Sequence, residues 1–132
     1  MRPAILLTAF LLMQLFCFPQ EYFSLKKLLP QTFLLSFEAK NKSGKTVMLS
    51  WSTSAENTLS HFVVQRSIDE NNFDDEAIIF TEQNIKVPKR KYKFPDKVEA
   101  VMSTILFYRL KMVGLDGEIN YSAVKKIRLK KR

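Results

Sequence analysis

The sequence predicts an all-β domain, an antiparallel β-sandwich of about seven strands. Apolar and polar side chains alternate along successive short segments, which is the pattern of strands with one buried face. Segments rich in Asn, Asp, Gly and Ser separate them, and no helical period appears after the first twenty residues. Because strands of this kind bury their apolar faces against another sheet, two packed sheets are expected.

Length and composition indicate one folded domain. The chain has 132 residues, of which 46% are hydrophobic and 12% aromatic, and this excludes a disordered chain. Its single cysteine is Cys17, so no disulfide can form within the chain. The fold therefore depends on packing alone.

Residues 1–20 read as a signal peptide. Ala4–Phe18 is apolar apart from Thr8 and Gln14. The run is short for a membrane-spanning helix and suits a secretory signal helix, so we expect a protein that is secreted or held at the cell surface. An uncleaved membrane anchor and a lipid-modified Cys17 stay open as alternatives.

The first half of the domain, after a connector over residues 21–31, shows three strands. Gly44 lies in a turn over residues 41–45 and is free to adopt positive φ. Arg66 continues the inward phase of the third strand and is expected at the rim, with its charge in water. The predicted strands and their inward residues are residues 33–39 with Phe33, Leu35, Phe37 and Ala39, residues 46–52 with Val47, Leu49 and Trp51, and residues 61–68 with Phe62 and Val64.

The second half alternates less regularly. Residues 69–75 form a turn, and residues 77–80 a short apolar strand without clear facing. In the basic segment 86–97, Tyr92 and Phe94 alternate with lysines, and Pro95 indicates an edge strand. The inward residues of the final hairpin, which turns at Asp116-Gly117, are Leu106, Tyr108, Leu110 and Met112, then Ile119, Tyr121, Ala123, Ile127 and Leu129.

Three segments together resemble a known family: LPQTFLLSFEAK (Leu29–Lys40), VMLSWSTSAENTLSHFVVQRS (Val47–Ser67) and FYRLKMVGLDGEINYS (Phe107–Ser122). They resemble the fibronectin type III-like module of secreted Bacteroidetes proteins, which often precedes a type IX secretion sorting domain. The resemblance implies a fibronectin type III- or immunoglobulin-like sandwich over residues 32–132, with a basic C-terminal tail.

The same resemblance assigns structural roles to two aromatic residues. It makes Trp51 the core tryptophan of the second strand. It makes Tyr108 a corner tyrosine, whose hydroxyl group caps the backbone a few residues upstream. The predicted structural core consists of Trp51, Phe62, Val64, Tyr108, Leu110 and Tyr121. The segment between Phe80 and Lys97 is longer and more basic than the family pattern. No sorting domain is recognisable after Leu129, so a stand-alone module and a fragment of a longer protein both stay open.

Residues for catalysis or metal binding are scarce. His61 is the one histidine, and no nucleophile elbow accompanies it, so we expect no enzyme. If the signal peptide is cleaved, one histidine and no cysteine remain, and these cannot close a zinc site. The acidic segment 69–76 is rich in oxygen ligands, but its spacing fits no calcium loop, so a solvated turn is favoured. No cofactor and no metal are predicted.

The net charge of +8 favours acidic partners such as polysaccharide or anionic lipid, and predicted export makes nucleic acid unlikely. The basic residues form two clusters, which we expect in opposite sheets and therefore on separate patches. Solvated strand faces are the alternative to anion binding. The candidate anion-binding residues are Lys89, Arg90, Lys91 and Lys93 in the first cluster, and Lys126, Arg128, Lys130, Lys131 and Arg132 in the second.

These observations favour a non-catalytic exported module, a spacer or adhesion domain that contacts protein or polysaccharide at the cell envelope. It would contact a membrane only if its first segment is not cleaved. Two alternatives remain: a binder of acidic polysaccharide through the basic clusters, and an accessory domain of a larger secreted enzyme. The oligomeric state is left open.

Overall fold

The computed structural model describes residues 34–54, 56, 58–82 and 87–130. The predicted signal peptide, Cys17 and the connector lie outside the described residues, as do Lys131 and Arg132 at the end of the second basic cluster. Within the described residues, no helix is long and apolar enough to cross a membrane.

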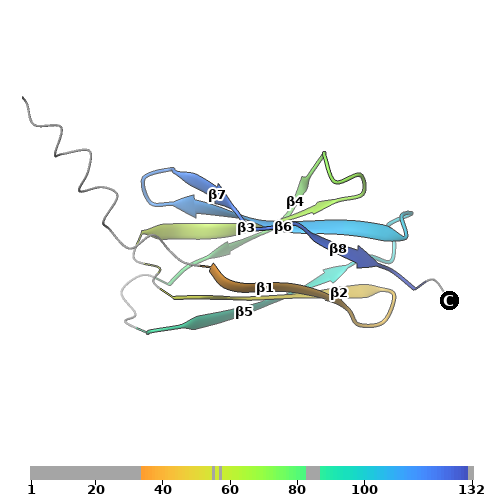
Figure 1. Ribbon diagram of the computed structural model, residues 1–132, viewed down its shortest axis with the longest axis horizontal. Coiled ribbons are helices and arrows are strands. Elements are labelled where there is room, and N and C mark those ends of the chain that lie inside the picture. Colours follow the sequence, from red (N-terminus) through yellow and green to blue (C-terminus); the bar gives the residue numbers. More distant parts are fainter. Residues whose placement is uncertain (1–33, 55, 57, 83–86, 131–132) are drawn as a thin grey trace, which may run out of the picture.

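The described chain forms two antiparallel sheets packed face to face, which confirms the predicted all-β sandwich (Figure 1). One sheet has the order β1-β2-β5, and the other has the order β4-β3-β6-β7 with β8 also paired to β6. The eight strands are β1 (Leu34–Asn41), β2 (Thr46–Thr53), β3 (Leu59–Ser67), β4 (Asp74–Phe80), β5 (Arg90–Lys97), β6 (Ile105–Gly114), β7 (Ile119–Tyr121) and β8 (Lys125–Arg128).

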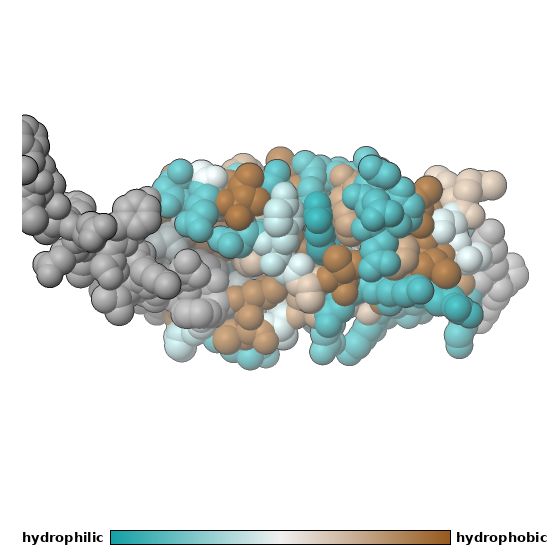
Figure 2. Space-filling view, turned by 45° about the horizontal axis from the view of Figure 1, so that its top comes forward, coloured by the Kyte–Doolittle hydropathy of each residue, from teal (hydrophilic) through white to brown (hydrophobic). Residues whose placement is uncertain are grey.

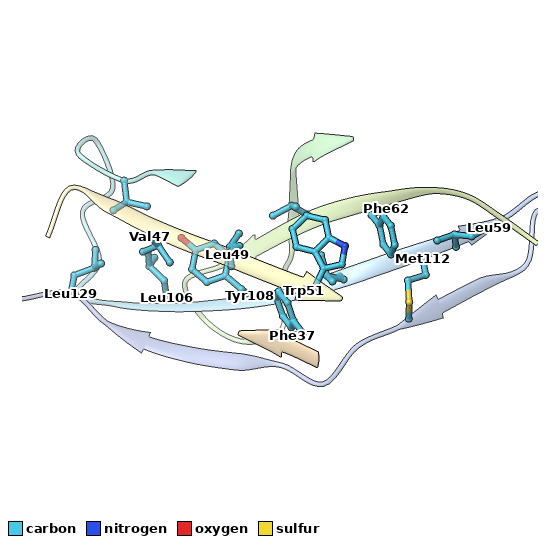
Figure 3. Close-up of a cluster of buried hydrophobic side chains, with 13 residues drawn as sticks. Phe37, Val47, Leu49, Trp51, Leu59, Phe62, Leu106, Tyr108, Met112 and Leu129 are labelled. Atoms are coloured by element: carbon cyan, nitrogen blue, oxygen red, sulfur yellow. The ribbon is translucent and has the colours of Figure 1, made fainter. Parts of the chain in front are cut away.

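The core is built by the central strands β2, β3 and β6, whose inward residues are those that the period of two predicts. Trp51 lies between the sheets, near Phe62 and Tyr108 (Figure 3). Burying one such side chain stabilises the fold by about 1.5–3 kcal/mol. The inward side chains of these three strands are Val47, Leu49, Trp51, Phe62, Val64, Leu106, Tyr108, Leu110 and Met112.

Strand β1 departs from the predicted alternation at its start. The pairing with β2 shifts between Leu34 and Ser36, which is the mark of a bulge. The bulge brings Leu34 against the core and turns Leu35 to solvent, while Phe37 stays buried. The prediction that Leu35 faces inward is therefore wrong, because one extra residue reverses the facing of a strand.

The prediction that Tyr121 belongs to the core is also wrong, and its side chain is 50% exposed. Strand β7 pairs Tyr121 with Lys111 and Asn120 with Met112. Directly paired residues share a face, and Met112 points inward, so the register turns Tyr121 outward. Ile119, opposite the outward residue Val113, is exposed for the same reason.

The last predicted strand is divided into β7 and β8 around Ser122. The Ser122 backbone N–H donates to the Leu110 carbonyl oxygen, and the Ser122 Oγ accepts from the Leu110 N–H. A side chain thus replaces one backbone partner at this point, and the strand breaks. Strand β8 then resumes beside β6, where Ile127 packs against the core and Leu129 follows it as a buried residue.

The position of Gly44, in the turn between β1 and β2, imposes two constraints that only glycine satisfies. Its φ is +75°, in the left-handed region. A Cβ added there would lie 2.8 Å from the carbonyl oxygen of Lys130, so the turn packs directly against the chain after β8. The first constraint was predicted from the sequence, and the second follows only from the packing.

We expect Gly44→Ala to destabilise the domain more than Gly117→Ala does. Both glycines have positive φ, which costs a non-glycine residue about 1–2 kcal/mol. Nothing lies within 4 Å of a Cβ added at Gly117, whereas Gly44→Ala also pushes against a backbone oxygen. Urea denaturation of both variants measures the difference, and equal losses would show that the contact with Lys130 has no energetic weight.

Candidate functional site

A cluster of charged and phenolic groups connects the two sheets near one edge. Asp96 of β5 is buried, and its Oδ2 accepts from Arg66 Nη1 at 2.7 Å and from the Tyr108 hydroxyl at 2.6 Å. Arg66 Nη2 lies 2.8 Å from Glu76 Oε1 of β4. Two sequence predictions change here. Arg66 points between the sheets instead of reaching out into water, and the Tyr108 hydroxyl binds a carboxylate instead of upstream backbone.

Burial and pairing act against each other in this cluster. Burial raises the pKa of Tyr108, and the hydrogen bond to Asp96 raises it further. Burial lowers the pKa of Arg66, but the hydrogen bond to Asp96 and its charge more than compensate, so the net direction is upward. The pKa of Glu76 is raised, since burial outweighs the opposing charge of Arg66 in spite of their close contact. The four groups are thus paired with one another across the two sheets.

A second cluster surrounds Glu56 beside the core tryptophan. Its carboxylate accepts from the Tyr92 hydroxyl at 2.8 and 2.9 Å and from Thr53 Oγ1, and Arg90 Nε lies at 3.4 Å. The Tyr92 ring stacks on Trp51 with centroids 5.3 Å apart. Burial, and then the bond to Glu56, raise the pKa of Tyr92 to about 12. Tyr92 therefore closes the core with its ring and holds Glu56 with its hydroxyl.

Stability should fall as the pH rises from about 10 to 12, because tyrosine in an unfolded chain has a pKa near 10. Over that range the unfolded chain releases protons that folded Tyr92 and Tyr108 retain. The unfolded state then binds fewer protons, so the free energy of unfolding decreases with pH. Urea midpoints across this range measure the slope, and Tyr92→Phe should make it shallower. An unchanged slope in Tyr92→Phe would contradict the proposed contribution of this phenol.

The acidic segment 69–76 is organised as a hydrogen-bonded turn followed by a strand. Asp69 Oδ1 accepts from the backbone N–H groups of Asn71 and Asn72, and from Ser67 Oγ. These hydrogen bonds hold the pKa of Asp69 well below its ordinary range, and the bond from the Asn72 backbone has the largest effect. Asp75 accepts from Gln65 Nε2 at 2.7 Å. In the described part of the chain, no group of three His, Cys, Asp or Glu residues is arranged to hold a metal ion.

The two basic clusters lie in opposite sheets, as expected, and the structure does not bring them together. Lys91 and Lys93 are exposed on β5, an edge strand, and Lys89 precedes it. Arg90 of the same strand is mostly buried in ion pairs with Glu56 and Glu82, so its charge is already compensated. On the other sheet, the exposed residues of the second cluster are Lys126 and Arg128 of β8 and Lys130 beyond it.

The outer face of the five-stranded sheet carries two rows of side chains, mostly apolar, which we call the apolar face. Pairing across β4, β3, β6 and β7 aligns them. Phe80 is 70% exposed and Ile78 57%, with Tyr121 and Ile119 about half exposed. In Figure 2, which turns this sheet forward, brown side chains lie among teal ones. The rows are Phe80, His61, Val113 and Ile119, and then Ile78, Val63, Lys111 and Tyr121.

The apolar face was not predicted from the sequence, although one signal pointed to it. The runs Val63-Val64 and Ile78-Ile79-Phe80 have consecutive apolar residues, so both faces of β3 and β4 are apolar there. For this reason the sequence does not show which side chains of residues 77–80 point inward. A strand with one solvated face should alternate instead. His61 lies on this face, with its ring centroid 5.4 Å from that of Phe80 and its Nδ1 3.0 Å from Ser60 Oγ.

Arg109 of β6 is held rigidly next to the apolar face. Its guanidinium carbon lies 4.0 Å from the centre of the Phe73 ring and 4.3 Å from that of Tyr121. Arg109 Nε donates to Gln65 Oε1 at 2.7 Å. Among the described residues, no carboxylate forms an ion pair with Arg109. Its planar cationic group therefore contacts two aromatic rings and one amide side chain.

Comparison with known proteins identifies the fold and no family. Two crystal structures of wild-type OgpA from Akkermansia muciniphila match 76% of this chain at 10% sequence identity, with TM-scores of 0.58 and 0.55. The matched part is 28% of the OgpA chain in one structure and 29% in the other. No family model matches the sequence, and no curated protein matches it. The chain is therefore a β-sandwich structurally similar to part of OgpA.

Proposed function

We propose that this chain is a non-catalytic β-sandwich module that serves as an accessory domain of a larger secreted enzyme. The observation that carries the proposal is the match to OgpA, in which a similar sandwich makes up 28% of a much longer chain. A sandwich of this shape thus occurs as one component of a larger protein. The fibronectin type III-like resemblance and the apolar N-terminal segment support export.

The internal polar clusters support a structural role for the sandwich itself. Asp96 and Glu56 are both engaged with cationic and phenolic groups of the same fold. Such pairing leaves these carboxylates without an open site at which a substrate would react. Catalysis is accordingly assigned to another domain or chain.

The experiment that tests this function is intact-mass analysis of the native protein in its cellular fraction. Antibody against the purified sandwich would isolate the native polypeptide together with any stable companion. We expect a larger polypeptide or complex that contains a catalytic domain. In-frame removal of the sandwich should then leave the turnover number of the enzyme nearly unchanged while altering its stability or substrate affinity. A free chain without a catalytic companion would favour the envelope spacer or adhesion function instead.

A second candidate function, binding of acidic polysaccharide, is favoured by one observation. Lys91, Lys93 and Lys97 alternate with inward residues along β5, so they form one exposed row. None of the three forms an ion pair with a described carboxylate. Lysines on an edge strand also hinder pairing with other sheets, so this row has a structural use as well.

Charge reversal at Lys91 and Lys93 separates polysaccharide binding from general attraction. We expect the Lys91→Glu/Lys93→Glu variant to elute from a polyglucuronate column at lower salt than the parent chain, because exposed charge interactions are screened. Lys126→Glu/Arg128→Glu on the other sheet is the matched control with the same change in net charge. If both variants elute alike, the retention reflects net charge and the row is not a binding site.

A further inference from the structure

We infer that the apolar face is the docking surface for the folded catalytic domain that this module accompanies, and that the partner presents a carboxylate to Arg109 and Lys111. This inference rests on the proposed accessory function and specifies its interface. Three features of the described structure support it: the exposure of apolar side chains, the restrained cation beside them, and the charge of the chain.

The first feature is the contrast between the outer faces of the two sheets. The three-stranded sheet presents polar residues such as Ser50, Glu38 and Lys93, which lie opposite one another in register. The five-stranded sheet presents the two rows of the apolar face, whose members are aliphatic or aromatic apart from Lys111 and His61. The exposed apolar side chains lie on the outer strands β4 and β7, with half-buried Val113 and buried Val63 aligned between them. Apolar side chains gathered on one face mark an interaction site more than isolated exposed residues do.

The second feature is the fixed position of Arg109. An exposed arginine ordinarily loses conformational entropy when it binds an anion. The stacking on Phe73 and Tyr121 and the bond to Gln65 already restrict its guanidinium. Since Tyr121 also belongs to the apolar face, the cation and the apolar rows form one continuous surface. A partner carboxylate would receive two parallel hydrogen bonds from such a group.

A second copy of this chain is disfavoured as the occupant of the apolar face. Two copies that met through this face would bring together two surfaces that each carry Arg109 and Lys111, in a chain with net charge +8. Like charges that face each other in an interface oppose association. An acidic polysaccharide would satisfy the cations but would leave Ile78 and Ile119 without an apolar partner. A protein surface with an apolar centre and an acidic residue satisfies both.

Photo-crosslinking in the native protein tests the docking surface. A benzophenone amino acid replaces Phe80 on the apolar face, and Ser50 on the outer face of the other sheet serves as the control position. We expect the Phe80 probe to crosslink to a catalytic domain, in the same chain or another, with a carboxylate near the linked peptide. The Ser50 probe should give little of this product.

Charge reversal shows whether the interface uses Arg109. Arg109→Glu should lower the crosslink yield from position 80 by about tenfold or more. Lys93→Glu, on the other sheet, should leave it unchanged. Reversing the partner's acidic residue to arginine should restore the yield with Arg109→Glu. Urea denaturation checks that each variant folds. Arg109→Lys is a milder change, which keeps the charge but removes the planar guanidinium group that can donate two parallel hydrogen bonds.

The outcomes separate the interface from the function. Equal yields from Phe80 and Ser50, a crosslink to a second copy, or a crosslink to polysaccharide would overturn the docking surface. If intact-mass analysis finds a catalytic companion while the apolar face crosslinks to nothing, the docking surface fails and the accessory function stands. If the face crosslinks to a non-catalytic protein and no catalytic companion is found, the accessory function fails.

Discussion

Replacing Trp51 with alanine should lower the free energy of unfolding by about 3–5 kcal/mol. Its side chain is only 2% exposed, meets the Phe62 ring edge-on at 5.5 Å between centroids, and stacks on Tyr92 at 5.3 Å. A domain of this kind is stable by about 5–15 kcal/mol in total. The substitution would therefore remove much of the stability and could leave the chain unfolded.

The loss should come from ring packing rather than from a hydrogen bond. Trp51 Nε1 has no acceptor among the described residues, although it is buried. Trp51→Phe keeps one ring between Phe62 and Tyr92, so it should cost less than Trp51→Ala. Thermal and urea unfolding of both variants, followed by circular dichroism, measure the two losses. A fall in melting temperature of only about 2 °C for Trp51→Ala would contradict a central role for this residue.

The central strands could be predicted from the sequence because each is paired on both sides. β2 lies between β1 and β5, β3 lies between β4 and β6, and β6 is paired to β3 on one side and to β7 and β8 on the other. A slip in any of them would disturb two neighbours and expose a whole row of core residues. The alternation of Val47, Leu49 and Trp51 therefore appears unchanged in the structure.

The wrong facings lie on outer strands or in the break after β7, where Ala123, predicted to face inward, is exposed. The bulge that exposes Leu35 is in β1, at the edge of its sheet, and the register that exposes Tyr121 belongs to the short strand β7. Edge strands tolerate bulges and breaks because only one neighbour constrains them. A prediction based on strict alternation assumes an unbroken strand, so it cannot locate a bulge or a break.

The candidate docking surface depends on pairing that a single sequence does not display. Phe80, His61 and Ile119 are distant along the chain and become neighbours only when β4, β3, β6 and β7 align. The clamp on Arg109 likewise combines Phe73, Gln65 and Tyr121 from three further segments. Composition showed the excess of positive charge, but the position of this restrained cation follows from the register of the strands.

Removing the Asp96 carboxylate should be almost as costly as removing Trp51, at about 3–5 kcal/mol. Asp96→Leu leaves the Tyr108 hydroxyl buried without its acceptor and Arg66 without its closest anion, which now lies 2.7 Å away. Glu76 stays near Arg66 and limits the loss. A loss of unfolding free energy below about 1 kcal/mol for Asp96→Leu would be typical of a weak, exposed ion pair and would contradict this prediction.

A double-mutant cycle separates the net stabilisation by the Arg66–Asp96 ion pair from the penalty of leaving one partner unpaired. A buried ion pair replaced as a whole by apolar residues often costs little, whereas one stranded charge costs much. Arg66→Met/Asp96→Leu should therefore be more stable than Asp96→Leu alone, as measured by urea denaturation. Asp96 belongs to the three-stranded sheet and Arg66 to the five-stranded sheet. The coupling energy of the cycle thus measures how strongly this polar contact fixes one sheet on the other, and additive losses would show that the two sheets are held by the apolar core alone.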